Sequence, residues 1–173
     1  MNGNAETLTL SRNPPQGALA VVIFEPIGQF AYKLFKSPRH PGNRDDPMSE
    51  CRIRDYFRSE LDAYAIVSAS PQLARHVARF YGVPPVRAVI EEDGEDKSEH
   101  FLLDCCLKLE RLQGQDEKLG NLRERFPHLE EFGGQLQQAG VNHVRDSSVF
   151  NPDDPERFKL IDIATFDWGA VPE

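Results

Sequence analysis

Two short, mostly apolar runs stand near the N-terminus. The first run is Leu19–Phe24 and the second is Gln29–Phe35, with Glu25–Gly28 between them. Such runs, rich in β-branched and aromatic residues and joined by a Pro and Gly turn, are typical of a β-hairpin. In the second strand Lys33 stands between apolar neighbours, where it is either a solvated lysine on an edge strand or a charge that needs a partner.

A helical period follows the polar loop at residues 37–50. Apolar residues three or four positions apart from Arg52 to Val67 predict a helix, and Glu60 falls within this apolar stripe. A buried carboxylate is costly unless a cation pairs with it. Glu60 therefore reaches either water at the margin of the stripe or a lysine across a groove.

The remaining periodic segments complete the predicted order of elements. Residues 76–83, 86–90 and 101–107 read as strands. Residues 116–126 and 128–139 read as helices, and Gly140 is a plausible C-terminal stop. The pattern predicts an α+β fold, in which a mostly antiparallel sheet with one helix is followed by a helical part.

Composition narrows the class of partner. The net charge is −8 and no basic cluster is present, which argues against nucleic acid because such binding depends on Lys and Arg. No apolar run approaches the roughly eighteen residues of a membrane helix, and residues 1–11 lack a signal-peptide pattern. The three cysteines form no disulfide framework or metal-ligand spacing, as expected of reduced thiols in a cytosol-like compartment.

Three polar residues near the C-terminus suggest phosphoryl-transfer chemistry. Asp146 is followed five positions later by Asn151, and Asp162 interrupts the apolar run Phe158–Ile163. In phosphoryl transfer one acidic group orients the attacking hydroxyl, while an amide and a carboxylate hold Mg²⁺ against the nucleotide phosphates. In isolation, Asp146 and Asn151 also suit an ordinary turn.

This order resembles the catalytic core of protein kinases, whose catalytic-loop Asp and Asn precede a metal-binding Asp. Lys33, in Phe30–Leu34, looks like the family's strand lysine, and Glu60 looks like its helix glutamate. Gly17 stands about where the last glycine of the phosphate-covering loop belongs. The resemblance implies that Lys33 and Gly17 contact ATP, that Glu60 holds Lys33, and that Asp146 is the catalytic acceptor. It assigns Mg²⁺ to Asn151 and Asp162.

Several positions depart from the kinase pattern. The chain is 173 residues long, so most of the larger lobe would be missing. Arg12 and Pro14 occupy positions where the phosphate-covering loop carries glycines, and Ser148 stands where Ser/Thr kinases commonly carry a lysine. Asp162 is followed by Ile163 and Ala164 in place of Phe and Gly. His143 is three residues before Asp146, whereas the kinase motif has its histidine two before. The similarity is therefore to minimal kinase-like proteins, such as the short effector kinases of some bacteria.

The resulting expectation is a two-lobed, kinase-like domain, with a small lobe at about 8–104 and a reduced larger lobe at about 105–173. It would use ATP and Mg²⁺ to phosphorylate a protein hydroxyl, without a nucleic-acid or membrane partner. The alternatives are a pseudokinase or protein-interaction module without catalysis, and a small-molecule phosphotransferase. The expected location is the cytoplasm or, for a secreted effector, a host cell.

Overall fold

The computed structural model of the chain describes residues 5–43 and 48–166. Residues 1–4 of the N-terminus and 44–47 of the expected polar loop lie outside the described residues. The fold is mixed α+β, and the chain divides into two units. Unit one comprises residues 1–57 and 80–111, and unit two comprises residues 58–79 and 112–173. The expected lobe boundary near residue 104 falls inside a strand of unit one, and the two-lobed kinase fold stays a prediction.

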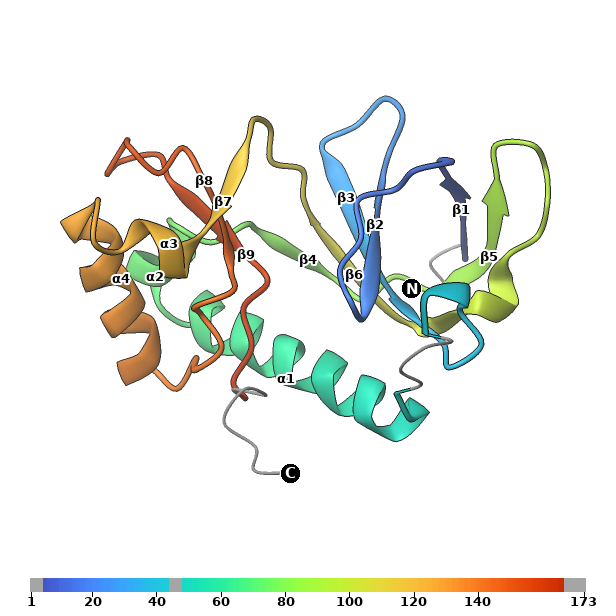
Figure 1. Cartoon of the computed structure of the whole chain (residues 1–173), viewed down its shortest axis with the longest axis horizontal. Helices are drawn as coiled ribbons and strands as arrows, with labels where there is room; N and C mark the ends of the chain where they lie inside the picture. The colour runs from blue at the N-terminus through green and yellow to red at the C-terminus, as the bar shows by residue number, and fades with distance from the viewer. Residues whose placement is uncertain (1–4, 44–47, 167–173) are drawn as a thin grey trace. The chain divides into compact units, whose positions relative to one another are not determined.

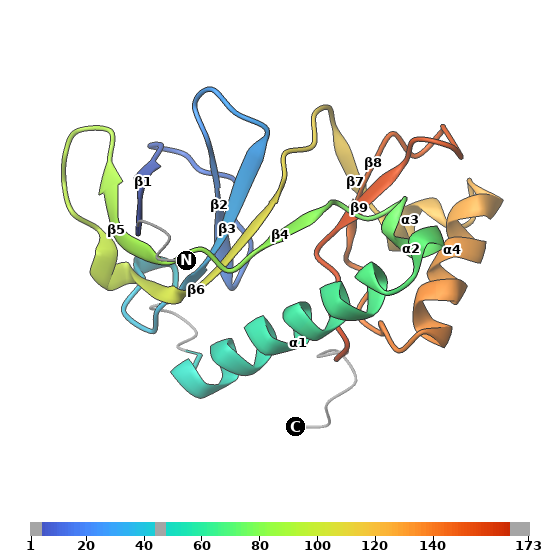
Figure 2. The same cartoon turned by 180° about the vertical axis from the view of Figure 1, so that it is seen from behind.

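Unit one is built on strands (Figures 1 and 2). Its elements are β1 (Glu6–Leu10), β2 (Ala20–Phe24), β3 (Phe30–Lys36), β4 (Phe80–Gly82), β5 (Val86–Glu91), β6 (Phe101–Glu110) and the 3-10 turns η1 (Pro41–Asn43) and η2 (Ser98–His100). The first eight residues of helix α1 (Glu50–Ser68) also belong to unit one, and the rest of α1 belongs to unit two. The expected hairpin is confirmed as β2 and β3, which pair in antiparallel register.

The sheets of unit one differ from the single sheet expected. Four strands form a sheet in the order β2-β3-β6-β4. The segment expected at 86–90 is indeed a strand, β5, but it pairs in parallel with β1 and lies outside that sheet. The alternating stretch Glu6–Leu10 was not predicted as a strand. Its partner lies about 80 residues away in sequence, and a local pattern cannot reveal such a pairing.

Strand β3 is buried on both of its faces. On one face Leu34 joins an apolar cluster that includes Leu10 of β1 and Val89 of β5. On the other face Phe35 meets Phe57 of α1, with the ring centroids 5.4 Å apart. Strand β3 therefore lies in the middle of the core of unit one, with neighbours on both sides.

Unit two joins a small sheet to helices. Its elements besides α1 are α2 (Pro71–Ala74), β7 (Asp116–Lys118), α3 (Leu119–Leu122), α4 (Pro127–Gln138), β8 (Ser148–Phe150) and β9 (Lys159–Ile161). The strands form an antiparallel sheet in the order β7-β8-β9, and α3 and α4 stand to the same side of it in Figures 1 and 2. Phe158 packs between Phe132 of α4 and His76. The centroid of its ring is 5.2 Å from that of Phe132 and 4.0 Å from that of His76, which stacks on it.

The helices predicted from the sequence are only partly confirmed. The helix expected at 52–67 is confirmed as α1, and the one at 128–139 as α4, which ends before Gly140 at φ 97°. The helix expected at 116–126 is wrong, because this segment starts as strand β7 and only residues 119–122 are helical. Pairing of β7 with β8 overrides the helical period there. The strand expected at 76–83 is limited to β4.

Candidate functional site

The sheet of unit two has two ends that matter for the predicted site. Ser148 lies opposite Lys118 on one side and opposite Ile161 on the other. We call this the Lys118 end. Phe150 lies opposite Lys159 at the other end of the same strands, which we call the Phe150 end. A residue that precedes β8 or follows β9 therefore belongs to the Lys118 end, and one that follows β8 belongs to the Phe150 end.

Asp146 and Asp162 both belong to the Lys118 end. Asp146 is exposed in the turn before β8, and Asp162 directly follows β9. The hydroxyl of Ser147, which is 0% exposed, donates a hydrogen bond of 2.9 Å to the carbonyl oxygen of Asp162. Two of the predicted residues are thus held on adjoining stretches of backbone. Two carboxylate residues at one end of a sheet are of the type needed to handle a hydroxyl proton and a hard cation.

Asp162 adopts an unusual backbone conformation. Its φ is 62°, in the left-handed region that L-residues other than Asn and Asp seldom occupy. Asp and Asn tolerate this conformation better than other L-residues, and Asn151 adopts it as well, with φ 51°. The chain leaves β9 in this conformation, while the neighbouring Ile163 is fully buried.

Asn151 lies at the Phe150 end, away from the two aspartates. It follows β8, whereas Asp162 lies beside Ser147, which precedes β8. The three residues of β8 separate Ser147 from Asn151, which makes four steps along the chain, or about 13 Å at ~3.3 Å per step. Ligands of one Mg²⁺, each about 2.1 Å from the ion, lie only about 3 Å apart. The geometry therefore does not bring Asn151 and Asp162 to one metal ion.

Asn151 lies apart from the two aspartates because Asp146 and Asn151 do not share one loop. Strand β8 fills the space between them, so the five-position spacing crosses the sheet from one end to the other. The φ of Asn151 is 51°, and its carbonyl accepts a hydrogen bond of 3.1 Å from the backbone N–H of Asp154. Asn151 thus begins the turn between β8 and β9, which is the ordinary role of this residue type.

Lys118 is a further polar residue at this end, and it was not expected from the sequence. Its Nζ donates a hydrogen bond of 3.0 Å to the hydroxyl of Ser148. The ammonium of Lys118 reaches Ser148 from the neighbouring strand, β7. No local signal marks Lys118, because its pairing with Ser148 spans 30 residues.

Lys33 and Gly17 lie in unit one. Lys33 sits on β3 opposite Val22 and Leu107, with Nζ 5.6 Å from the centroid of the Phe35 ring. A Cβ added to Gly17 would meet no atom within 4 Å, so nothing near Gly17 requires a glycine. The carbonyl of Gly17 accepts a hydrogen bond of 2.7 Å from Nζ of Lys36.

Glu60 lies on the part of α1 that belongs to unit two, and only 1% of its surface is exposed. The position of Glu60 within the apolar stripe implied that a buried carboxylate here would need a partner, and the carboxylate is indeed buried. Lys33 and Glu60 belong to different units, and their pairing stays a prediction.

A group of acidic residues outside the predicted site is also close together. Glu91, Asp93 and Glu95 each offer a carboxylate oxygen, and these atoms lie within 4.8 Å of one another. Lys97 already pairs with two of them, at 3.8 Å from Glu91 and 2.6 Å from Glu95. The group contains neither of the residues assigned to Mg²⁺.

Comparison with known proteins adds no family assignment. No protein-family model and no curated protein matches the chain. Among the helices of residues 5–43 and 48–166, none has the length and apolar character needed to span a bilayer. The cysteines Cys51, Cys105 and Cys106 are all free.

Proposed function

We propose that the chain is a minimal kinase-like phosphotransferase that uses ATP and Mg²⁺ to phosphorylate a protein hydroxyl. The observation that carries the proposal is that Asp146, Asp162 and Lys118 all belong to the same end of the sheet of unit two. An acceptor for the hydroxyl proton, a ligand for a hard cation and a cation for the transferred phosphoryl group are the chemical parts that this reaction needs.

Each residue has a distinct role in the proposal. Asp146 accepts or orients the substrate hydroxyl, and Lys118 offsets negative charge on the phosphoryl oxygens. Asp162 holds Mg²⁺, which neutralises charge on the phosphates when bound. Mg²⁺ usually keeps several waters and takes one or two carboxylates besides substrate phosphates, so Asp162 fits it without Asn151. Lys33, oriented by Glu60, contacts the nucleotide phosphates.

Thermal melting with and without Mg·ATP tests the nucleotide site. A ligand present at one hundred times its dissociation constant stabilises a protein by about 2.7 kcal/mol, which raises the melting temperature by about 5–10 °C for a chain of this size. Asp162→Ala should lose this rise, while Asn151→Ala should keep it because Asn151 lies at the other end of the sheet. Asp153→Ala, an exposed carboxylate in the β8–β9 turn, is the matched charge control.

Transfer itself is measured with radiolabelled ATP. Asp146→Asn should leave the Mg·ATP melting shift intact and strongly reduce labelling of the protein itself or of proteins in a lysate, because Asp146 is assigned to the hydroxyl and not to the nucleotide. A wild-type protein whose melting temperature ignores Mg·ATP would refute the phosphotransferase proposal. Equal labelling by wild type and Asp146→Asn would remove Asp146 from the reaction.

A noncatalytic interaction module is the second candidate, and a specific surface favours it. The turn between β2 and β3 presents Ile27, which is 97% exposed, close to Phe24, which is 38% exposed. Arg12 and Pro14 also stand where a phosphate-covering loop would need glycines. Binding of Mg·ATP without transfer to any acceptor would indicate a pseudokinase, and absence of nucleotide binding would indicate the interaction module. Labelling of a small metabolite in place of protein would indicate a small-molecule phosphotransferase.

A further inference from the structure

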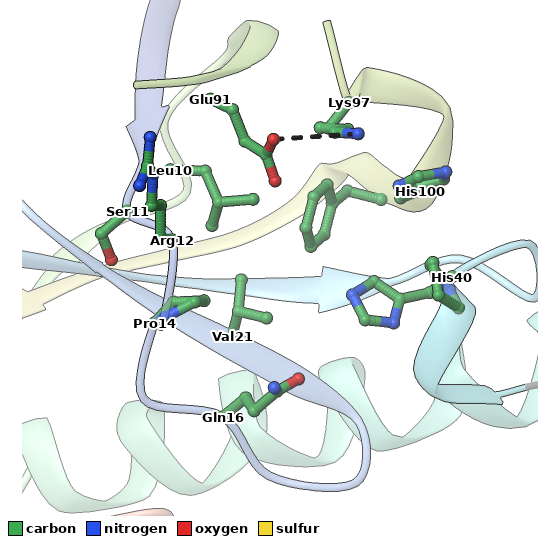
Figure 3. Close-up of a pocket in the computed structure, with 12 residues that line it drawn as sticks. Leu10, Ser11, Arg12, Pro14, Gln16, Val21, His40, Glu91, Lys97 and His100 are labelled. Atoms are coloured by element: carbon green, nitrogen blue, oxygen red, sulfur yellow. Dashed lines mark ion pairs between the residues drawn. The ribbon is translucent and has the colours of Figure 1, made fainter. Parts of the chain in front are cut away.

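A pocket of about 170 Å³ opens in unit one beside the start of the β2–β3 hairpin (Figure 3). Its walls include the apolar residues Leu10, Val21 and Phe101 and the polar residues Arg12, His40 and Lys97. Water occupies about 30 Å³ per molecule in the liquid, so this space can hold a group much larger than one water. None of Lys33, Glu60, Asp146 and Asp162 lines the pocket.

A buried lysine next to the pocket lacks a chain carboxylate. Lys36 is only 4% exposed, and burial lowers the pKa of its ammonium. Within the part of the chain that the structure describes, Nζ of Lys36 hydrogen-bonds to the Gly17 carbonyl at 2.7 Å, and no carboxylate forms an ion pair with it. Buried charges in proteins are normally matched by an opposite charge. An anion from outside the chain would supply that match.

His40 presents a hydrogen-bond donor to the same space. Its Nδ1 accepts a hydrogen bond of 3.0 Å from the backbone N–H of Gly42, so the neutral ring carries its proton on Nε2. Burial, with the positive charge of Lys36 and the nearby His100, lowers the pKa of His40 to about 4. At neutral pH the ring, which points into the pocket in Figure 3, is an uncharged donor in a positive field.

The wall of the pocket carries charged groups of both signs. Lys97 is matched by Glu91, at 3.8 Å, and by Glu95, at 2.6 Å. The Glu91 pair is the dashed line of Figure 3. Among the described residues this leaves Arg12 in the wall and Lys36 behind it as cations without a carboxylate. Arginine and lysine beside a neutral imidazole donor form a donor set suited to phosphate oxygens.

We infer that this pocket binds the phosphate group of a small molecule, with Arg12 and the Nε2–H of His40 as its contacts and the ammonium of Lys36 as a nearby positive charge. The apolar floor formed by Leu10, Val21 and Phe101 can accept an organic part attached to the phosphate. The inference does not rest on the proposed phosphotransferase activity, because it uses none of the residues assigned to that activity.

Proton binding at His40 provides the test. The protein is labelled with ¹⁵N-histidine, and the NMR signals of the His40 ring are assigned by their loss in His40→Gln. These signals are followed against pH in chloride and in inorganic phosphate at equal ionic strength. A bound anion favours the charged ring, so phosphate should raise the pKa of His40 by about one unit or more, a tenfold gain in proton affinity. Calorimetry at pH 7 with inorganic phosphate and with phenyl phosphate measures binding directly. Tighter binding of phenyl phosphate identifies an organic phosphate as the ligand, and equal affinities identify the free ion.

Variants of the contacts decide whether the pocket is the binding site. Arg12→Gln and Lys36→Met should each weaken phosphate binding about tenfold or more. Arg39→Gln removes the same charge next to His40 from an exposed position that does not line the pocket, and it should bind as the wild type does. Arg12 is exposed, so Arg12→Gln keeps the test valid if Lys36→Met does not fold. A His40 titration identical in phosphate and chloride, or unchanged binding in Arg12→Gln, would overturn the inference.

Discussion

Replacement of Ser147 by alanine should destabilise the protein measurably, because one hydrogen bond joins this residue, next to Asp146, to the backbone of Asp162. Ser147 is fully buried, and its hydroxyl donates at 2.9 Å to the carbonyl of Asp162. Alanine fits the same space but removes the hydroxyl that donates to that carbonyl. Removing one partner of a buried hydrogen bond costs about 1–3 kcal/mol. For a chain of 173 residues this lowers the melting temperature by about 2–12 °C.

Urea denaturation of wild type, Ser147→Ala and the neighbouring Ser148→Ala measures the effect. Ser148 is also buried, but its hydroxyl accepts from Lys118, whose exposed ammonium can turn to water. Ser148→Ala should therefore cost about 0.5 kcal/mol or less. The slope of the unfolding free energy against urea should not change in either variant. Equal losses in the two variants, or a loss below about 0.5 kcal/mol in Ser147→Ala, would refute the role given to this hydrogen bond.

Three further outcomes are expected. A double-mutant cycle of Lys33→Met and Glu60→Gln should show a coupling energy of about 1 kcal/mol or more in urea unfolding, and additive losses would reject the ion pair. The folded-state pKa of His40 is lowered to about 4, so the unfolded chain binds that proton first. The neutral His40 ring therefore favours the folded state fully above about pH 6.5, and this stabilisation is lost as the pH falls toward 4. In phosphate-free buffer the melting temperature of His40→Gln should therefore depend less on acid pH than that of the wild type. Gly140→Ala should lose roughly 1 kcal/mol in urea unfolding because φ is 97° there, and unchanged stability would mean that the turn relaxes at no cost.

The elements that were predicted correctly are those whose local pattern agrees with their tertiary contacts. Helix α1 and the β2–β3 hairpin carry a strong period and are bounded by turn residues, and both were anticipated within a few positions. Strands β1 and β7 were missed because what makes them strands is a partner elsewhere in the chain, β5 for one and β8 for the other. Their own sequences are short and polar enough to suit other conformations.

Some residues of the candidate site could likewise be anticipated from the local sequence, and others could not. A carboxylate at the end of an apolar run predicts a polar group at the end of a strand, and Asp162 lies there. The spacing from Asp146 to Asn151 was read as one loop, but Val149 and Phe150 between them are strand residues. A short apolar pair within a polar stretch carries too little periodicity to be recognised as β8. Lys118 could not be anticipated at all, because only the pairing of β7 with β8 brings it to Ser148.

The path of the chain through the two units limits how the protein can be divided. Each unit is assembled from two separate stretches, residues 1–57 with 80–111 and residues 58–79 with 112–173. A single cut in the backbone therefore releases neither unit whole, and a fragment that ends at residue 111 still carries the segment 58–79 without its partner. A single chain for one unit would need its two stretches joined anew, residue 57 to residue 80 for unit one or residue 79 to residue 112 for unit two. Helix α1, continuous from Glu50 to Ser68 across residue 57, would have to be broken in either case.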